Sequence, residues 1–551
     1  MKKIIFILGL AAVVLGTSCS DVLDLNPADR FSPATVWSTT TTADKYVIGL
    51  YSIFGANTEM RGGDAYASPR LSDAYSDILK STSWNQYNHN FNATLLQETA
   101  FNSNSAGAFE CWSSHYDRIR RENEFLRDAA EFGSKFGEDW LKIRIAEVRF
   151  CRAYAYFMLC RVYSGVILRT EVDGPEQNDK ARSTEEECWG FIINELKELA
   201  PDLPLKWDSD NSGRATQKAA YGLLSRVALY AEKWDIAAQA ARDCATAEGN
   251  LDLSENGYAK IFELGINSPE VLFAVEFKSS VIDHAYDAYV RPSGDTKELG
   301  KQVYSGFVPT SELVDSYEMA GDGGNFSWEK HGKDPYANRE PRFYATILYN
   351  GADWMGRKIE SFVGGKDGYK AYENAGAAGT TVTGYYLRKY LIDGDKTWVT
   401  SGSGQDWIVL RYAEVLLNKA EALAMENWNK NSAEALQALN DVRARVGLPA
   451  RATADKETFL EYVRHERKVE LAGEGFRYWD LRRWRLAEKV IDGQNVHGVK
   501  ISKQSDGSFT YEQVDADGGH KRIFYDRYYR FAIPLSERSN NSLCTNNDGW
   551  I

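Results

Sequence analysis

The segment from Ile408 to Trp484 constrains the fold more than any other part of the chain. Its apolar residues recur at steps of three and four, the spacing of one buried helix face. This pattern predicts three helices: one from Ile408, a second through Ala435 to Val446 after a short loop, and a third ending at the Gly473/Gly475 pair. Alanines between the large residues let neighbouring helices approach closely. We expect the three helices to meet at Leu416, Leu439 and Val469.

The third helix is crowded with charged residues. Glu466, Glu470 and Glu474 stand four residues apart and would share one helix face. Paired carboxylates are the equipment of glycoside hydrolysis, but basic neighbours hold carboxylates ionised instead of raising one pKa for general-acid work. These neighbours are Arg464, Arg467, Lys468, Arg477, Arg482 and Arg483. We therefore favour an ion-pair network that locks the turn at Gly475 onto its neighbours.

Helical spacing also recurs in the N-terminal half. The predicted helices there are Ala43–Phe54, Phe109–Ala130, Trp140–Tyr163, Gln217–Glu232 and Trp234–Ala247. The last two resemble a tetratricopeptide unit, with Trp234 and Ala237 after a short turn and the small residue of the first helix at Ser225. Long insertions separate the hairpins, so the pattern indicates a helical scaffold and not a tandem array.

The expected fold is predominantly α, a tetratricopeptide-like helical-hairpin scaffold with a long loop-rich, partly β insertion. The insertion is rich in Gly, Tyr and Asp, and short alternating runs at Phe343–Tyr349 and Tyr528–Pro534 predict strands. The expected divisions are an export signal at 1–18, an N-terminal helical region at 19–250, the insertion at 251–407, and a C-terminal helical block with its tail at 408–551.

The first 18 residues have the order of a secretory signal. Lys2 and Lys3 precede an apolar run, Ile4 to Leu15, that is too short to span a bilayer as a helix. Cys19 follows Leu15-Gly-Thr-Ser, which resembles a lipobox with its leucine four instead of three positions before the cysteine. We expect Cys19 to carry several acyl chains, which together make a stable membrane anchor.

Charge and motif content exclude several function classes. The net charge of −13 disfavours nucleic acid and anionic membrane surfaces as partners. The seven histidines form no HxH or HExxH, and the six cysteines beyond Cys19 form no CxxC. There is also no G-x-S-x-G, no GxxxxGK, and no GxGxxG after a strand. The sequence therefore predicts no catalytic residue, no metal and no cofactor, and we expect most of these cysteines to be small buried hydrophobes.

Aromatic residues in polar loops are candidates for a binding surface. Trp84 and Tyr87 stand beside Asn85 in a strongly polar loop, and Tyr304 and Trp328 lie in the insertion. Flat rings complement the apolar faces of sugars, while Tyr and Trp keep a polar group. Packing onto the core is the alternative for each ring.

Several motifs resemble the SusD/RagB family, outer-membrane-associated glycan-binding lipoproteins of Bacteroidetes. They are YAEVLLNKAEAL from Tyr412, RHERKVELAGEGFRYWDLRRW from Arg464, Phe531-Ala-Ile-Pro534 and Asn547-Asp-Gly-Trp550. The resemblance runs from Cys19 to the C-terminus. It implies a glycan ligand, a TonB-dependent (SusC-like) outer-membrane transporter as partner, and an outward-facing position on the outer membrane. It also implies a sugar site with contributions from Trp84, Asn85 and Tyr87 on an N-terminal loop and from Tyr304 and Trp328 on a central one.

Three functions remain open at this point. Non-catalytic capture of oligosaccharides for delivery to the transporter is favoured, because an anchor, a helical frame and aromatic-bearing loops occur together. A protein-docking scaffold that binds no glycan is second. A hydrolase is third, since no specific catalytic motif supports it.

The lipid anchor gives a direct expectation for Cys19→Ala. Without acyl chains the protein should leave the membrane in a carbonate wash, whereas wild type and the matched variant Cys111→Ala should stay in the pellet. Fractionation followed by immunoblotting measures this. Equal retention of Cys19→Ala would place the anchor elsewhere.

Overall fold

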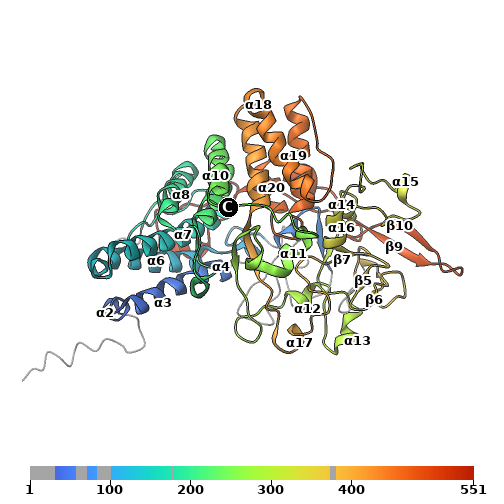
Figure 1. Ribbon diagram of the computed structural model, residues 1–551, viewed down its shortest axis with the longest axis horizontal. Helices are drawn as coiled ribbons and strands as arrows, with labels where there is room; N and C mark the ends of the chain where they lie inside the picture. The colour runs from blue at the N-terminus through green and yellow to red at the C-terminus, as the bar shows by residue number, and fades with distance from the viewer. Residues whose placement is uncertain (1–31, 57–70, 83–100, 175–178, 373–379, 551) are drawn as a thin grey trace, which may run out of the picture.

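The computed structural model describes residues 32–56, 71–82, 101–174, 179–372 and 380–550. Cys19, Trp84, Asn85 and Tyr87 lie outside these ranges. Figure 1 shows the N-terminal helices on the left, the C-terminal helices α18 and α19 standing at the top, and the loop-rich insertion with its short strands below and to the right. The protein is thus a helical scaffold carrying a loop-rich, partly β insertion, and the expected fold class is confirmed.

The N-terminal region is a series of helices, most of which pack against the next one along the chain. The described helices are α2 (Pro33–Val36), α3 (Thr40–Leu50), α4 (Ser52–Ala56), α6 (Trp112–Phe132), α7 (Glu138–Tyr163), α8 (Glu185–Leu199), α9 (Gln217–Tyr230) and α10 (Trp234–Thr246). All five predicted helices are confirmed, the first one as the pair α3 and α4. Thr39 begins α3 with a capping box. The sequence analysis missed α8, which Thr184 and Glu187 cap in the same way.

The insertion consists of short elements. Its helices are α11 (Gly257–Leu264), α12 (Tyr286–Val290), α13 (Asp295–Leu299), α14 (Ser311–Val314), α15 (Trp328–His331), α16 (Pro341–Thr346) and α17 (Trp398–Ser401). The strand predicted at Phe343–Tyr349 is wrong for its first part, because Pro341 begins α16 there. Proline suits the first turn of a helix, where its missing N–H costs nothing. Only Ile347 and Leu348 form a strand.

The strands of the described ranges form five antiparallel pairs. They are β1 (Leu79–Ser81) with β3 (Phe307–Pro309), β2 (Val271–Val275) with β8 (Trp407–Arg411), β4 (Ile347–Leu348) with β7 (Tyr386–Leu387), β5 (Asp353–Trp354) with β6 (Arg357–Lys358), and β9 (His497–Lys503) with β10 (Phe509–Asp515). The strand predicted at Tyr528–Pro534 is wrong: a 3₁₀ turn covers Asp526–Tyr529, and the rest is extended chain whose Phe531 N–H donates to the Val162 carbonyl.

The C-terminal block begins with a strand and not with the predicted helix. Trp407–Arg411 is β8, buried along its whole length, so helix begins at Tyr412 and not at Ile408. A continuous apolar run of this length suits a strand covered on both faces. The helices are α18 (Tyr412–Arg445), α19 (Lys456–Glu470), α20 (Arg477–Arg483), α21 (Ala487–Ile491) and α22 (Leu535–Asn540). Asn427 has non-helical angles (φ −164°, ψ 93°) and divides α18 into two arms. The break lies two residues before the predicted loop, residues 429–432, which is helical.

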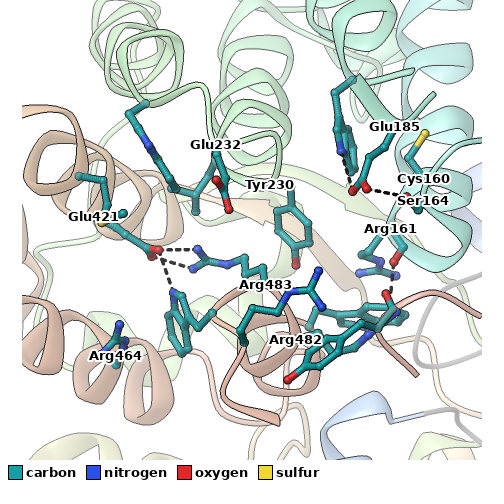
Figure 2. Close-up of a pocket in the computed structure, with 18 of the residues that line it drawn as sticks. Cys160, Arg161, Ser164, Glu185, Tyr230, Glu232, Glu421, Arg464, Arg482 and Arg483 are labelled. Carbon is teal, nitrogen blue, oxygen red and sulfur yellow. Dashed lines mark hydrogen bonds and ion pairs between the residues drawn. The ribbon is translucent and has the colours of Figure 1, made fainter. Parts of the chain in front are cut away.

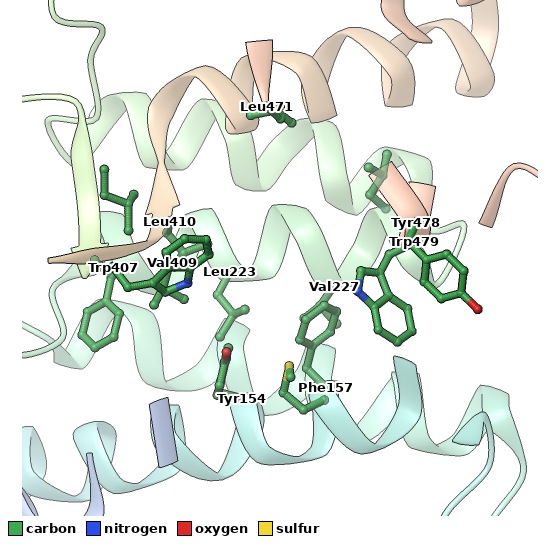
Figure 3. Close-up of a cluster of buried hydrophobic side chains, with 14 of the residues drawn as sticks. Tyr154, Phe157, Leu223, Val227, Trp407, Val409, Leu410, Leu471, Tyr478 and Trp479 are labelled. Carbon is green, nitrogen blue, oxygen red and sulfur yellow. The ribbon is translucent and has the colours of Figure 1, made fainter. Parts of the chain in front are cut away.

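One hydrophobic core joins the N-terminal helices to the C-terminal block. Figure 3 shows side chains from four elements in it: Tyr154 and Phe157 of α7, Leu223 and Val227 of α9, Val409 and Leu410 of β8, and Tyr478 and Trp479 of α20. The expected core residues Leu416, Leu439 and Val469 are 6%, 0% and 0% exposed, so their predicted burial is confirmed. The six cysteines of the described ranges are buried and unbridged, as expected.

Leu416→Ala should lower the free energy of unfolding by about 2–5 kcal/mol, because it leaves a cavity where helices meet. The matched variant is Leu253→Ala, whose side chain is 75% exposed and should cost less than about 0.5 kcal/mol. Urea denaturation of both variants measures the two losses. Equal stability of Leu416→Ala and wild type would remove Leu416 from the core.

Candidate functional site

The three glutamates of the predicted network are buried in a cluster of arginines. Glu470 contacts Arg411 at 2.6 Å, Arg342 at 2.9 Å, and Arg445. Glu474 bonds to the same Arg411 at 2.6 Å and to Lys389 at 2.9 Å. The basic partners of Glu470 and Glu474 come from different parts of the chain. Arg342 is in α16, Lys389 follows β7, Arg411 ends β8 and Arg445 ends α18. The expected ion-pair network is therefore confirmed.

A second branch of the network surrounds Glu466. It pairs with Arg342 and, at 3.0 Å, with Arg443, and Arg443 in turn holds Glu318 at 2.9 Å. Glu270 closes the cluster, pairing with Arg411 at 3.0 Å and with Arg445 at 2.5 Å. Each of these side chains is at most 1% exposed. The charges are thus compensated inside the protein and not by water.

The partners of the three glutamates differ from those that sequence spacing suggested. Of the six neighbouring basic residues, none pairs with them in the described structure: Arg467 and Arg483 bond Asp480, Lys468 and Arg477 bond Asp77, Arg464 bonds Glu461, and Arg482 donates to the Tyr529 carbonyl. The observed partners of the glutamates lie on α16, in the connection between β7 and α17, on β8 and at the end of α18. Tertiary packing, which local spacing does not reveal, brings them together.

The basic residues of the network keep Glu470 and Glu474 ionised. Burial raises the pKa of Glu470, but Arg445, Arg411 and Arg342 outweigh burial and hold that pKa well below its ordinary value. In the same way Arg411 and Lys389 overcome burial and lower the pKa of Glu474. A general acid needs the opposite shift. These glutamates are therefore suited to holding the fold together and not to proton transfer.

A buried carboxylate fastens the N-terminal part to the turn after α19. Asp73 accepts the backbone N–H groups of Gly473 (2.9 Å), Gly475 (3.2 Å) and Arg477 (2.9 Å). Gly473 and Gly475 have φ of 77° and 79°, the left-handed region that favours glycine. This explains the glycine pair that ends the third predicted helix.

Tyr304 lies at the surface beside a second tyrosine. Its N–H donates to the Ala288 carbonyl (2.7 Å), and Gly306 N–H donates to the Tyr289 carbonyl (2.6 Å), which ties the segment before β3 to α12. The rings of Tyr289 and Tyr304 have centroids 4.8 Å apart and are tilted by 30°. Both are half-buried, so part of each ring faces solvent.

The β1–β3 pair brings Thr82 close to the segment that carries Tyr304. Thr82 N–H donates to the Gly306 carbonyl at 3.0 Å, directly beyond the pairing of Ser81 with Phe307. Thr82 is the last described residue before the segment that contains Trp84, Asn85 and Tyr87. The chain therefore enters the N-terminal loop close to the segment that carries Tyr304.

Trp328 lies apart from Tyr304. Its indole N–H donates to the Asp315 carboxylate at 2.9 Å, and its ring centroid is 5.4 Å from that of Phe326 and 5.9 Å from that of Tyr511 in β10. Figure 1 shows α15 at the upper right beside the β9–β10 hairpin and α12 at the lower centre. The described structure does not bring the two residues of the central loop together.

A cavity that the sequence analysis missed lies between the N-terminal helices and the C-terminal block. It has a volume of about 350 Å³ and receives side chains from α7, α8, α9, α18, α19 and α20 (Figure 2). Six arginines and three glutamates line it: Arg161, Arg464, Arg482, Arg483, Arg485 and Arg530 with Glu185, Glu232 and Glu421. Several of these residues belong to the RYWDLRRW run that begins at Arg477. The density of arginine and tryptophan in this run was the sequence feature that could have indicated the cavity.

The described ranges contain neither a metal-binding group of side chains nor a helix that could span a membrane. No group of three or more His, Cys, Asp and Glu side chains is arranged to hold a metal ion there. Within the same ranges, every helix is either too short or too polar to cross a membrane.

Glu470→Gln tests the role of the network. The change leaves three buried arginines short of one negative charge, so the free energy of unfolding at pH 7 should fall by about 3–5 kcal/mol. The pKa of Glu470 is lower in the folded state, so its stabilising effect is present above the ordinary value of about 4.3 and is lost as the pH falls. The difference from wild type should therefore shrink between about pH 5 and pH 3.

The matched control is Glu461→Gln on the same helix, whose side chain is 71% exposed and pairs with Arg464. Its cost should stay below about 1 kcal/mol. Denaturant titrations over this pH range measure both variants. Losses of equal size would contradict a special role for the buried network.

Comparisons with known proteins agree with this architecture. The model of the SusD family matches residues 269–550, and a model described as "Starch-binding associating with outer membrane" matches residues 21–229. A SusD-like protein of Bacteroides ovatus is 24% identical over 547 residues, covering 94% of this chain and 90% of the relative.

Two solved structures share the fold. A SusD-like protein from Bacteroides fragilis aligns with a TM-score of 0.79 and 26% identity, over 94% of this chain and 98% of that one. A SusD-like carbohydrate binding protein from the same species aligns with a TM-score of 0.76 and 24% identity, over 92% and 99%. Because the SusD family model alone spans half of the chain, the resemblance seen in the sequence is confirmed: this protein belongs to the SusD family.

Proposed function

We propose that the protein is a non-catalytic glycan-binding lipoprotein on the outer face of the outer membrane. It captures oligosaccharides and delivers them to a TonB-dependent, SusC-like transporter. Membership of the SusD family supports this, as does the match to a model whose description combines starch binding with the outer membrane. In this proposal, acyl chains on Cys19, which follows a lipobox-like sequence, anchor the protein in the membrane.

The observation that carries the proposal is the Tyr289–Tyr304 pair. Two adjoining half-buried rings, with centroids 4.8 Å apart, combine apolar surface with two hydroxyl groups. Sugar rings have apolar faces framed by hydroxyls, so such a surface can stack on a sugar and bond to it. Tyr289 is on α12, and Tyr304 is held beside it on the segment before β3, so little ordering is needed on binding.

The other residues predicted for the glycan site are supported to different degrees. Trp84, Asn85 and Tyr87 belong to the segment that begins beside Gly306, so they are proposed as further contacts next to Tyr304. Trp328 stays in the set, although its indole N–H is already bonded to Asp315 and its ring packs on two neighbours. We therefore rank Tyr304 above Trp328.

The titratable groups support binding without hydrolysis. Burial raises the pKa of Glu122 to about 8, of Asp73 to about 7 and of Asp315 to about 6. None of the three lines either of the two described cavities of about 350 Å³. A glycosidase instead holds two carboxyl groups on either side of an accessible scissile bond.

Weak binding is sufficient for delivery. A shallow stacking site corresponds to a Kd on the order of 1 mM to 1 μM, about −4 to −8 kcal/mol. Anchoring beside a transporter raises the effective concentration for a second contact with the same glycan chain to roughly millimolar. Capture and release can therefore both be fast, as delivery requires.

Tyr304→Ala should weaken binding of the glycan that a glycan array selects by roughly two- to tenfold, because it removes a stacking ring worth about 0.5–1.5 kcal/mol. The matched control is Tyr221→Ala, a half-buried tyrosine on α9 that should bind as wild type does. Isothermal titration calorimetry measures both affinities, and melting curves confirm that both variants fold.

Trp84→Ala extends the test to the N-terminal loop. Unchanged affinity in Tyr304→Ala and Trp84→Ala would move the glycan site away from both loops. If the array selects no glycan at all, the docking scaffold becomes the better account of the protein.

A further inference from the structure

The cavity between α7, α9 and α20 contains positive charge without matching negative charge. Arg483 is paired with Glu421 at 2.5 Å, Arg464 with Glu461 at 2.6 Å, and Arg530 lies 3.6 Å from Glu185. In the described structure, the other three arginines of the lining form no ion pair: Arg161, Arg482 and Arg485. Glu232 is exposed and forms none either. The six arginines and three glutamates of the lining leave an excess of three positive charges.

Arg161 and Arg482 both lie against the same indole. Their guanidinium carbons are 4.1 Å and 4.7 Å from the ring centroid of Trp479. The Nε atoms of both are buried and have no hydrogen-bond partner in the described structure. Arg482 is only 5% exposed, and its other nitrogens reach only backbone carbonyls, those of Tyr529 (2.8 Å) and Arg161 (3.5 Å).

Two guanidinium groups with buried Nε atoms and without a counter-charge favour an anionic ligand. Buried donors normally have acceptors, and buried charges normally have counter-charges. Burial, together with the nearby Arg161 and Arg485 cations, lowers the pKa of Arg482 to about 10. By contrast, every charge of the Glu470 network has a partner. A bound anion would supply the missing acceptors and the missing charge at once.

The remaining lining indicates the kind of anion. Figure 2 shows Tyr230 above the Arg161–Arg482 pair, with Glu232 next to it and Glu185 and Glu421 on opposite sides. Carboxylates accept hydrogen bonds from hydroxyl groups, and tyrosine and tryptophan rings pack on sugar faces. Trp189, Trp234 and Trp484 add further aromatic surface. A volume of about 350 Å³ is at the lower end for small-ligand sites, which start at about 300 Å³.

We propose that this cavity is a second ligand site, which binds a hexuronate unit of an acidic oligosaccharide. The sugar carboxylate would accept hydrogen bonds from the guanidinium groups of Arg161 and Arg482, with Arg485 adding positive charge at the rim. The sugar ring would pack on Tyr230, and its hydroxyls would donate to Glu232. The site is separate from the Tyr289–Tyr304 surface and does not depend on it.

The test compares two sugars that differ in the carboxylate. The purified full chain is titrated calorimetrically with D-galacturonate and with D-galactose. We expect saturable binding of galacturonate, at least tenfold tighter than that of galactose, and a loss of affinity as sodium chloride is raised. Acetate should compete at least tenfold less well than galacturonate. Equal affinity for both sugars, or equal competition by acetate, would overturn the proposal.

Variants place the binding in this cavity. Arg161→Gln should weaken galacturonate binding at least tenfold, and Arg485→Gln, an exposed rim position, at least threefold. Arg120→Gln, 68% exposed on α6, is the matched control and should bind as wild type does. If Arg161→Gln fails to fold, Arg485→Gln decides alone. Wild-type affinity in the folded variants would show that galacturonate binds elsewhere and would contradict the proposed site.

Discussion

The structure depends on the buried ion-pair network around Glu466, Glu470 and Glu474. Its arginines come from α16, β8 and the end of α18, so it connects the insertion, the strand that begins the C-terminal block, and α19. Placing so many charges away from water is costly unless each one is paired. Complete pairing requires all of these elements to be in place together. The network therefore selects one arrangement of the scaffold, and the hydrophobic core supplies most of its stability.

This arrangement explains how the carboxylates of the family motif hold the fold together. The same glutamates that resemble hydrolytic equipment in sequence have arginines on every side, and Glu470 and Glu474 have lowered pKa values. We propose that recognition is left to surfaces at the edge of this frame. The Tyr289–Tyr304 pair lies on one such edge, and the arginine-rich cavity lies between the helices. A rigid frame with separate binding surfaces suits capture and transfer of a ligand.

The sequence predicted what local spacing determines. Helical periodicity gave the N-terminal helices, the two arms of α18 and the burial of Leu416 and Val469. It failed where distant segments decide the structure. Trp407–Arg411 became a strand because β2 lies beside it, and Pro341 began a helix inside an alternating run. Likewise, spacing showed that Glu470 would be paired, but Arg342 and Arg411 are distant in sequence. The Asp315 bond of Trp328 and the cavity around Arg482 depend on tertiary packing in the same way.

The central claim is that the protein binds a glycan and leaves it intact. The most direct measurement is a calorimetric titration of the full chain with the glycan selected by an array, followed by chromatography of the recovered glycan. The account predicts saturable binding with a Kd on the order of 1 mM to 1 μM and a recovered glycan of unchanged length. Shortened products with new reducing ends, or binding to no glycan on the array, would contradict it.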